Sequence, residues 1–245
     1  MHWLVSSIEA GPPVAAGLWK HITHYGAGPL APRRVTLTFD NGPTPGVTER
    51  VLEILDRAGL RSTFFVIGQK LRAPAAAALA RAARSAGHRI GNHTFTHSVA
   101  LGDRPTADYA AREIGDTQAC IGDLSHPDKL FRPYGNSGRI GPHLLSRPAL
   151  SYLLRHRFRT IIWNCVPGDW KDPNGWVESC IAQVEARDWS VVVLHDIESG
   201  CLPRLPELLQ RLADMGTIQE QEYSEDVTLT RAGQTVSMSP SYIAD

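Results

Sequence analysis

Two histidines four residues apart, His93 and His97, are the residues of this sequence best suited by type and spacing to bind a metal ion. That spacing lets both imidazoles reach one divalent cation, and the carboxylate of Asp40 follows an earlier apolar run. Two histidines and one carboxylate leave positions on Zn²⁺ open for a water and a substrate carbonyl. Such a pair alone is more often structural, but the polar residues described next favour a metal site.

Further polar residues also stand directly after apolar runs. Asp40 precedes Asn41-Gly42-Pro43, a turn sequence, and taken alone could be a turn carboxylate. His195 follows a valine-rich run, where a partly buried imidazole would suit a general acid. Asp169 could orient an imidazole, and the neighbouring Trp170 offers a flat wall for a sugar ring.

The elements that must position these residues alternate between β-branched runs and segments of helical period. Strands are predicted at 35–39, 63–67, 88–92, 129–132, 159–163 and 190–194. Helices are predicted at 47–58, 74–86, 107–124, 142–156, 176–187 and 205–215. This alternation predicts an α/β fold with a parallel sheet, and so many sequential units favour a barrel over a doubly wound sheet. Because the carboxyl ends of barrel strands meet on one face, we expect the polar residues to converge there.

The two ends of the chain lack this alternation. Residues 1–32 are rich in glycine and proline and are expected to form an N-terminal extension. Residues 33–216 would be the barrel domain, and 217–245 a C-terminal extension with a hairpin over 227–234.

Composition excludes several classes of protein. Lys plus Arg and Asp plus Glu are both 25, and this balance argues against a nucleic-acid partner. No apolar run approaches the roughly 20 residues of a membrane helix, so no membrane span is expected. The N-terminus shows no basic segment ahead of a sustained apolar stretch, and the four cysteines form no C-x-x-C pair. A cytoplasmic location is therefore predicted.

Five segments together resemble the polysaccharide deacetylase family, which is the NodB homology group or carbohydrate esterase family 4. They occur in the family's order between about Val35 and Met215: TFDNGP at 38–43, HTFTH at 93–97, FRPYG at 131–135, GDW at 168–170 and LHD at 194–196. The resemblance implies a distorted (β/α)7 barrel. It also implies metal-dependent removal of acetyl groups, with an N-acetylated amino sugar as the substrate.

The resemblance also assigns roles to single residues. Asp40 would be the general base for the attacking water, and His195 the acid that protonates the leaving amine. His93 and His97, with Asn41, would hold a divalent metal, most simply Zn²⁺, with Co²⁺, Ni²⁺ or Mn²⁺ as other candidates.

Supporting roles follow from the same resemblance. The backbone N–H of Tyr134 would stabilise the oxyanion, Arg132 would steady the catalytic carboxylate, and Asp169 would tune His195. Residues expected around the substrate are Trp170, Pro133, Val192 and Leu194, the last two near the acetyl methyl group.

Three departures from the family pattern bear on activity. Asn41 stands where the family usually has an aspartate as third metal ligand, although muramic-acid deacetylases of the family share this change. The arginine motif is one residue shorter before Tyr134, and Val166 replaces an aspartate. We expect reduced metal affinity from Asn41, because an amide oxygen brings no charge.

Two other functions remain open at this point. One is an amidase that acts on a small molecule other than a carbohydrate, and the other is a non-catalytic relative that binds a glycan. The presence of Asp40, His195 and Asp169 favours an enzyme, because a binding site has no need of an acid and a base.

Overall fold

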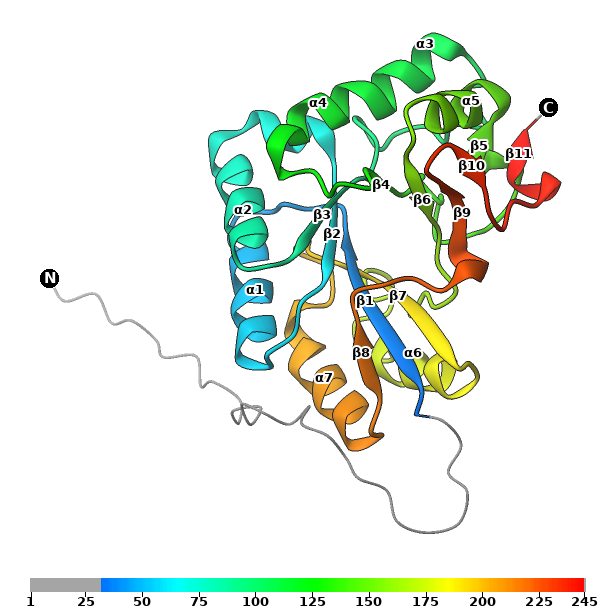
Figure 1. The fold of residues 1–245 in the computed structure, drawn as a ribbon. Coiled ribbons are helices and arrows are strands. Elements are labelled where there is room, and N and C mark those ends of the chain that lie inside the picture. Colours follow the sequence, from blue (N-terminus) through cyan, green and yellow to red (C-terminus); the bar gives the residue numbers. More distant parts are fainter. Residues whose placement is uncertain (1–31, 245) are drawn as a thin grey trace, which may run out of the picture.

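The computed structural model describes residues 32–244, which form an α/β fold around a curled nine-stranded sheet (Figure 1). The six predicted strands are present and lie parallel to one another, in the spatial order β6-β4-β3-β2-β1-β7. Their bounds are β1 (Arg34–Asp40), β2 (Thr63–Val66), β3 (Arg89–Asn92), β4 (Leu130–Phe131), β6 (Arg159–Ile161) and β7 (Trp189–His195). The parallel α/β prediction is therefore confirmed.

The sheet curls so that the loop after β6 comes next to β7. The two are joined there by an isolated parallel β-bridge between Cys165 and Val192. The backbone bonds there are Cys165 N–H to the Val191 oxygen at 3.3 Å and Val193 N–H to the Cys165 oxygen at 3.0 Å. The result is the expected distorted barrel, in which a loop rather than a strand closes the ring.

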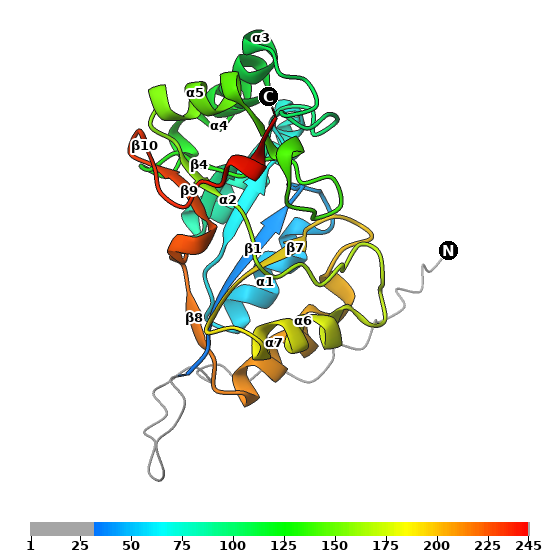
Figure 2. The same cartoon turned by 90° about the vertical axis from the view of Figure 1, so that its right-hand side faces the viewer.

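Helices cover the outer face of β1 and its neighbours. They are α1 (Thr48–Arg57), α2 (Pro74–Ser85), α6 (Trp176–Glu185) and α7 (Leu205–Asp214), with the short helix η1 (Gly68–Arg72) before α2. Figure 1 shows α1 beside α2, and Figure 2 shows α6 beside α7. Between them and the sheet lies a buried core that includes Leu37, Val51 and Leu208. Burying each such side chain contributes about 1.5–3 kcal/mol, so this core holds the strands in register.

The predicted helix over 107–124 is interrupted by a π-helical stretch. Helix α3 (Ala107–Ala110) leads into the π-helical segment η2 (Ala111–Asp116), and α4 (Thr117–Ile121) and η3 (Gly122–Leu124) follow. Segment η2 buries Glu113 and Ile114. A π-helical turn is rare and often lies beside a functional site.

The helix predicted over 142–156 begins later than expected. Helix α5 spans Arg147–Arg155, and the preceding residues form a short helix η4 (Pro142–Leu144) and strand β5 (Leu145–Ser146). The hydroxyl of Ser146 accepts a hydrogen bond from the Ala149 N–H at 3.3 Å and so caps the helix. Since Pro148 is suited to a first helical turn, the helix start lies at this Ser-x-Pro sequence.

Residues after α7 join the sheets instead of trailing from them (Figure 2). Strand β8 (Ile218–Glu220) pairs with β1, and the hairpin of β9 (Thr228–Arg231) and β10 (Gln234–Thr235) lies antiparallel to β6, where a hairpin was predicted. Near the end, β11 (Ile243–Ala244) pairs with β5. The remaining short helices are η5 (Leu202–Arg204), η6 (Glu225–Val227) and η7 (Pro240–Tyr242).

Apart from Pro32, the predicted N-terminal extension lies outside the described residues. Across 32–244, none of the helices is long and apolar enough to cross a membrane.

Candidate active site

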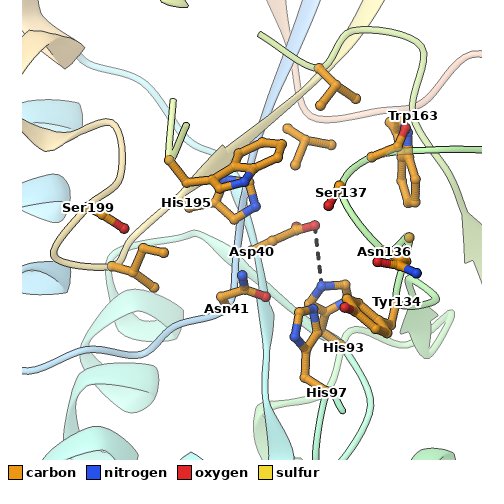
Figure 3. A pocket seen from close by; sticks show the side chains of 16 residues that line it. Asp40, Asn41, His93, His97, Tyr134, Asn136, Ser137, Trp163, His195 and Ser199 are labelled. Carbon is orange, nitrogen blue, oxygen red and sulfur yellow. Dashed lines mark hydrogen bonds and ion pairs between the residues drawn. The ribbon is translucent and has the colours of Figure 1, made fainter. Parts of the chain in front are cut away.

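A cleft at the carboxyl ends of the strands gathers the predicted chemistry (Figure 3). Its walls include seven of the residues proposed from the sequence: Asp40, Asn41, His93, His97, Tyr134, Trp170 and His195. These residues come from the ends of β1, β3, β4 and β7 and from the loop after β6. The expected convergence of strand-end polar residues is therefore observed.

Asp40 and His195 are partners in the strand register. They end β1 and β7, which are adjacent parallel strands, and they lie directly opposite each other. Neighbouring strands are about 4.8 Å apart, so the two side chains enter the cleft next to one another. Figure 3 shows the carboxylate of Asp40 between the His195 ring and the two other histidines.

The carboxylate of Asp40 is buried and forms an ion pair with the guanidinium of Arg132. Its Oδ1 accepts from Arg132 Nη1 at 2.8 Å, and its Oδ2 lies 3.5 Å from His93 Nε2. Arg132 is fully buried, and the same Nη1 also donates to the hydroxyl of Thr38 at 2.6 Å. A buried charge pair of this kind is rigid, and removing one member would leave the other unpaired at high cost.

The two neighbouring histidines are held in the neutral form that binds metals. The carbonyl oxygen of Arg132 can only accept, so Nδ1–H of His93 donates to it at 2.9 Å and the ring's lone pair is on Nε2. Burial lowers the pKa of His93. For His97, burial and the neighbouring His93 and His195 lower the pKa to about 2. The two ring centroids are 4.7 Å apart.

Asn41 lines the same cleft as His93 and His97 and has a hydrogen-bond acceptor without a partner. Its backbone has a left-handed φ of +74°, which asparagine tolerates better than most residues. Its side-chain oxygen Oδ1 is buried and has no hydrogen-bond partner. Leaving a buried acceptor unpaired costs about 1–3 kcal/mol, and a bound cation would relieve that cost.

These three residues fit a divalent cation, with an unusual third ligand. In the described part of the chain, no group of three or more His, Cys, Asp or Glu side chains is arranged to hold a metal ion. The side-chain oxygen of Asn41, which is buried and has no hydrogen-bond partner, is suited to be a third protein ligand beside His93 and His97.

Across the cleft, His195 is fixed by Asp169. Nδ1–H of the ring donates to Asp169 Oδ1 at 2.8 Å, and the ring of Trp170 lies edge-on with a centroid distance of 4.6 Å. Burial alone would lower the pKa of His195, but the hydrogen bond and negative charge of Asp169 outweigh it and raise the pKa. The carboxylates of Asp40 and Asp196 act in the same direction.

Three of the residues expected around the substrate do not line the cleft. Val192 and Leu194 are fully buried in the core on the helix side of β7, and Pro133 is buried outside the cleft lining. Successive side chains of a strand point to opposite faces, and Val193 and His195 are those of β7 that face the cleft. Val193 is therefore the valine of β7 that lines the cleft.

The sequence motifs left part of the cleft lining unassigned. Trp163 and residues 136–138 form one wall together with Gly135 and Val166, and Figure 3 shows Ser199 on the opposite side. Trp163 Nε1 donates to the backbone oxygen of Gly138 at 2.9 Å, and a Cβ on Gly135 would overlap the Trp163 ring. Only glycine allows this approach, so the loop is shaped by Trp163.

Fold and site together define a deacetylase class of hydrolases, as the motifs predicted. The family model described as "Polysaccharide deacetylase" matches residues 27–140. A chitooligosaccharide deacetylase of Azorhizobium caulinodans is 34% identical over 174 residues, which cover 69% of this chain and 75% of that protein. This chain belongs to the polysaccharide deacetylase family.

Two further relatives are similar over most of the chain. The peptidoglycan-N-acetylmuramic acid deacetylase PdaC of Bacillus subtilis is 29% identical over 74% of this chain, which spans only 36% of that protein. A family 4 acetyl xylan esterase from Clostridium thermocellum, solved with a cobalt ion, has a TM-score of 0.61 and 29% identity. That alignment covers 77% of this chain and 88% of the esterase chain.

Proposed function

We propose that this chain is a metal-dependent enzyme that removes the N-acetyl group from an amino sugar of an oligo- or polysaccharide. The observation that carries the proposal is the pairing of Asp40 and His195 across β1 and β7, each with its own buried partner, Arg132 and Asp169. Amide hydrolysis needs a base for the attacking water and an acid for the departing nitrogen, and these two residues supply one of each.

The roles of the two residues follow from their surroundings. Asp40 takes a proton from the attacking water while Arg132 keeps the carboxylate in place. His195, whose pKa is raised, keeps a proton to higher pH than a free histidine and gives it to the amine nitrogen as the C–N bond breaks. The products are acetate and the free amino sugar.

The oxyanion and the substrate ring engage other residues. The backbone N–H of Tyr134 would donate to the oxygen that gains charge during attack. Trp170 presents a ring at the edge of the cleft, against which the sugar would stack. When bound by His93, His97 and Asn41, a divalent cation would polarise the acetyl carbonyl and favour ionisation of water.

A non-catalytic glycan-binding role is the second candidate, and Asn41 is the observation that favours it. With neutral ligands only, the cation site has less attraction for metal than a His-His-Asp set. The buried pairs Asp40–Arg132 and His195–Asp169 argue against a non-catalytic role, because each holds an ionisable group in a reactive position.

Acetate release separates the candidates. Purified protein is first analysed for metal content and then incubated with N-acetylated chito-oligosaccharides, peptidoglycan fragments and N-acetylated small amides, with and without added Zn²⁺. Acetate released from the sugars, and lost in His195→Ala, supports the proposal. Turnover of small amides alone indicates an amidase, and glycan binding without turnover indicates the non-catalytic role.

A further inference from the structure

The segment 93–97, which carries both candidate metal-binding histidines, has neither helical nor strand structure. Thr94 and His97 adopt left-handed φ values of +65° and +54°, which are uncommon for such side chains. A backbone of this kind persists only where its surroundings hold it. The contacts around the segment therefore decide where the two imidazoles point.

Glu113 makes three hydrogen bonds to this segment. Its Oε2 accepts from the backbone N–H groups of Phe95 and Thr96, both at 2.9 Å. Its Oε1 accepts from the hydroxyl of Thr96, also at 2.9 Å. Glu113 is only 1% exposed, so these bonds form away from water and its carboxylate is fully committed to the segment.

The π-helical segment η2 that carries Glu113 is itself tied to strand β3. The side chain of Asn92 donates to the Ile114 oxygen at 2.8 Å and accepts from the Thr94 N–H at 3.1 Å. The hydroxyl of Thr117 donates to the backbone carbonyl oxygen of Glu113 at 2.8 Å. The carboxylate therefore projects from a helix that is fixed to the strand from which the histidine segment leaves.

Helix η1 holds the opposite side of the segment. The N–H groups of Gly68 and Gln69 donate to the carbonyl oxygens of Thr94 and Phe95, each at 3.0 Å. The N–H groups of Thr94, Phe95 and Thr96 are used by Asn92 and Glu113. The backbone of residues 94–96, between the two histidines, is therefore hydrogen-bonded on both sides.

We propose that Glu113 is a positioning residue that presets the His93–His97 segment for binding one divalent cation. Glu113 does not line the cleft, and it acts through the backbone of Phe95 and Thr96. The inference rests on the proposed function, since it assigns to Glu113 the geometry of that function's metal site. Contacts of this kind around metal ligands typically change metal affinity by about 10–100-fold when removed.

Two substitutions at one position test the hydrogen bonds directly. Glu113→Met keeps the length of the side chain and removes both acceptors. Glu113→Gln keeps an oxygen for the two N–H groups and an amide that can donate to Thr96. The matched control is Glu222→Met, which removes the ion pairs to Arg89 (2.6 Å) and Arg159 (2.9 Å) at the opposite ends of the strands.

Zn²⁺ is titrated into the metal-free proteins by calorimetry, and thermal unfolding is followed in parallel. We expect Glu113→Met to bind Zn²⁺ about 10–100-fold more weakly than wild type, and Glu113→Gln and Glu222→Met to bind it nearly as well. If excess Zn²⁺ restores kcat in Glu113→Met with KM unchanged, the defect lies in metal binding. Should Glu113→Met fail to fold, Glu113→Asp replaces it, because it keeps the charge and withdraws the oxygens by one methylene.

Each contrary result overturns the positioning role. One such result is wild-type Zn²⁺ affinity in a folded Glu113→Met protein. Another is an equal loss of Zn²⁺ affinity in Glu222→Met, which would mean that reduced stability causes the effect. A loss in Glu113→Gln as large as in Glu113→Met would show that charge, not the hydrogen bonds, is responsible. Acetate release by wild type would leave the proposed function intact in these cases. If wild type neither binds Zn²⁺ nor releases acetate, both proposals fail.

Discussion

Asp169 holds His195 at two points, the ring and the backbone. Its Oδ1 accepts from the ring Nδ1–H and its Oδ2 from the His195 backbone N–H, each at 2.8 Å. The carboxylate is fully buried and fixes both the orientation and the tautomer of the ring. The nitrogen left for chemistry is Nε2, which is the role proposed for the acid.

The substitution Asp169→Asn should move the alkaline limb of the pH–rate profile to lower pH. Burial lowers the pKa of His195 and the charge of Asp169 raises it, so the pKa should fall when that charge is removed. His195 then loses its proton at lower pH. We expect kcat to fall about 10²–10⁴-fold near neutral pH. A pH–rate profile of both proteins checks this, and an unchanged alkaline limb would contradict the assigned pair.

Asp40→Asn should remove most of the activity and also lower the free energy of unfolding, because the buried charge of Arg132 loses its partner. An amide cannot take the proton from water, but its oxygen can still accept from Arg132, so we expect about a 10²–10⁴-fold loss of kcat. Asp128→Asn is the matched control, because Asp128 pairs with Arg159 at 3.4 Å with its own side chain 47% exposed. Acetate release decides the outcome, and near-normal turnover in Asp40→Asn would exclude it as the base.

Asn41→Asp should tighten metal binding. The substitution keeps the shape of the side chain, and aspartate also tolerates the left-handed backbone at this position. It adds a negative charge to an otherwise neutral ligand set, so we expect at least about a tenfold gain in Zn²⁺ affinity. Metal titration of the two proteins tests this. Equal or weaker binding by the aspartate variant would mean that residue 41 is not a ligand.

His88 should make the protein less stable in mild acid. Burial and the charge of Arg61 lower the pKa of His88 from 6.5 to about 4. Between these values the unfolded chain binds a proton that the folded chain does not, so the free energy of unfolding falls as pH falls. The expected loss is about 3 kcal/mol between pH 6.5 and 4.

The variant His88→Asn isolates this contribution from that of the other buried histidines. It retains an acceptor for the Ser62 N–H, which donates to His88 Nδ1 at 3.1 Å. Urea unfolding at a series of pH values should show a shallower acid decline for the variant. Parallel curves for the two proteins would refute the role of His88.

A pair of adjacent valines tests the strand orientation at the cleft. Val192→Ala should lower the free energy of unfolding by about 1–3 kcal/mol with KM unchanged, because Val192 lies in the core. Val193→Ala should alter KM, because Val193 lines the cleft. Denaturant unfolding and steady-state kinetics separate the two. A change in KM for Val192→Ala would restore the original expectation.

This valine pair also shows where sequence reasoning ends. A strand that is buried on both faces has no alternation of polar and apolar residues, so the run 190–194 does not reveal which side chains face the cleft. The helices α1 and α7 were predictable because their apolar residues repeat at helical spacing on one side. Likewise, the strand ends were predictable because polar residues interrupt apolar runs there.

Glu113 illustrates the second limit. A glutamate inside a predicted helix is usually an exposed charge, and its partners Phe95 and Thr96 lie in a loop that sequence reasoning cannot place. The pairing of β8 with β1 and of β11 with β5 was missed for a similar reason. These strands are only three and two residues long, and tertiary contacts rather than local propensity define them.

The register of β1 against β7 has a consequence for how this scaffold can change. Since Asp40 and His195 are opposed by a backbone ladder, the spacing of their backbones is set by the sheet. The segments 135–138 and 197–199 line the cleft but are not part of that ladder. A library confined to those two loops would therefore change the walls of the cleft while β1 and β7 keep the two residues opposed.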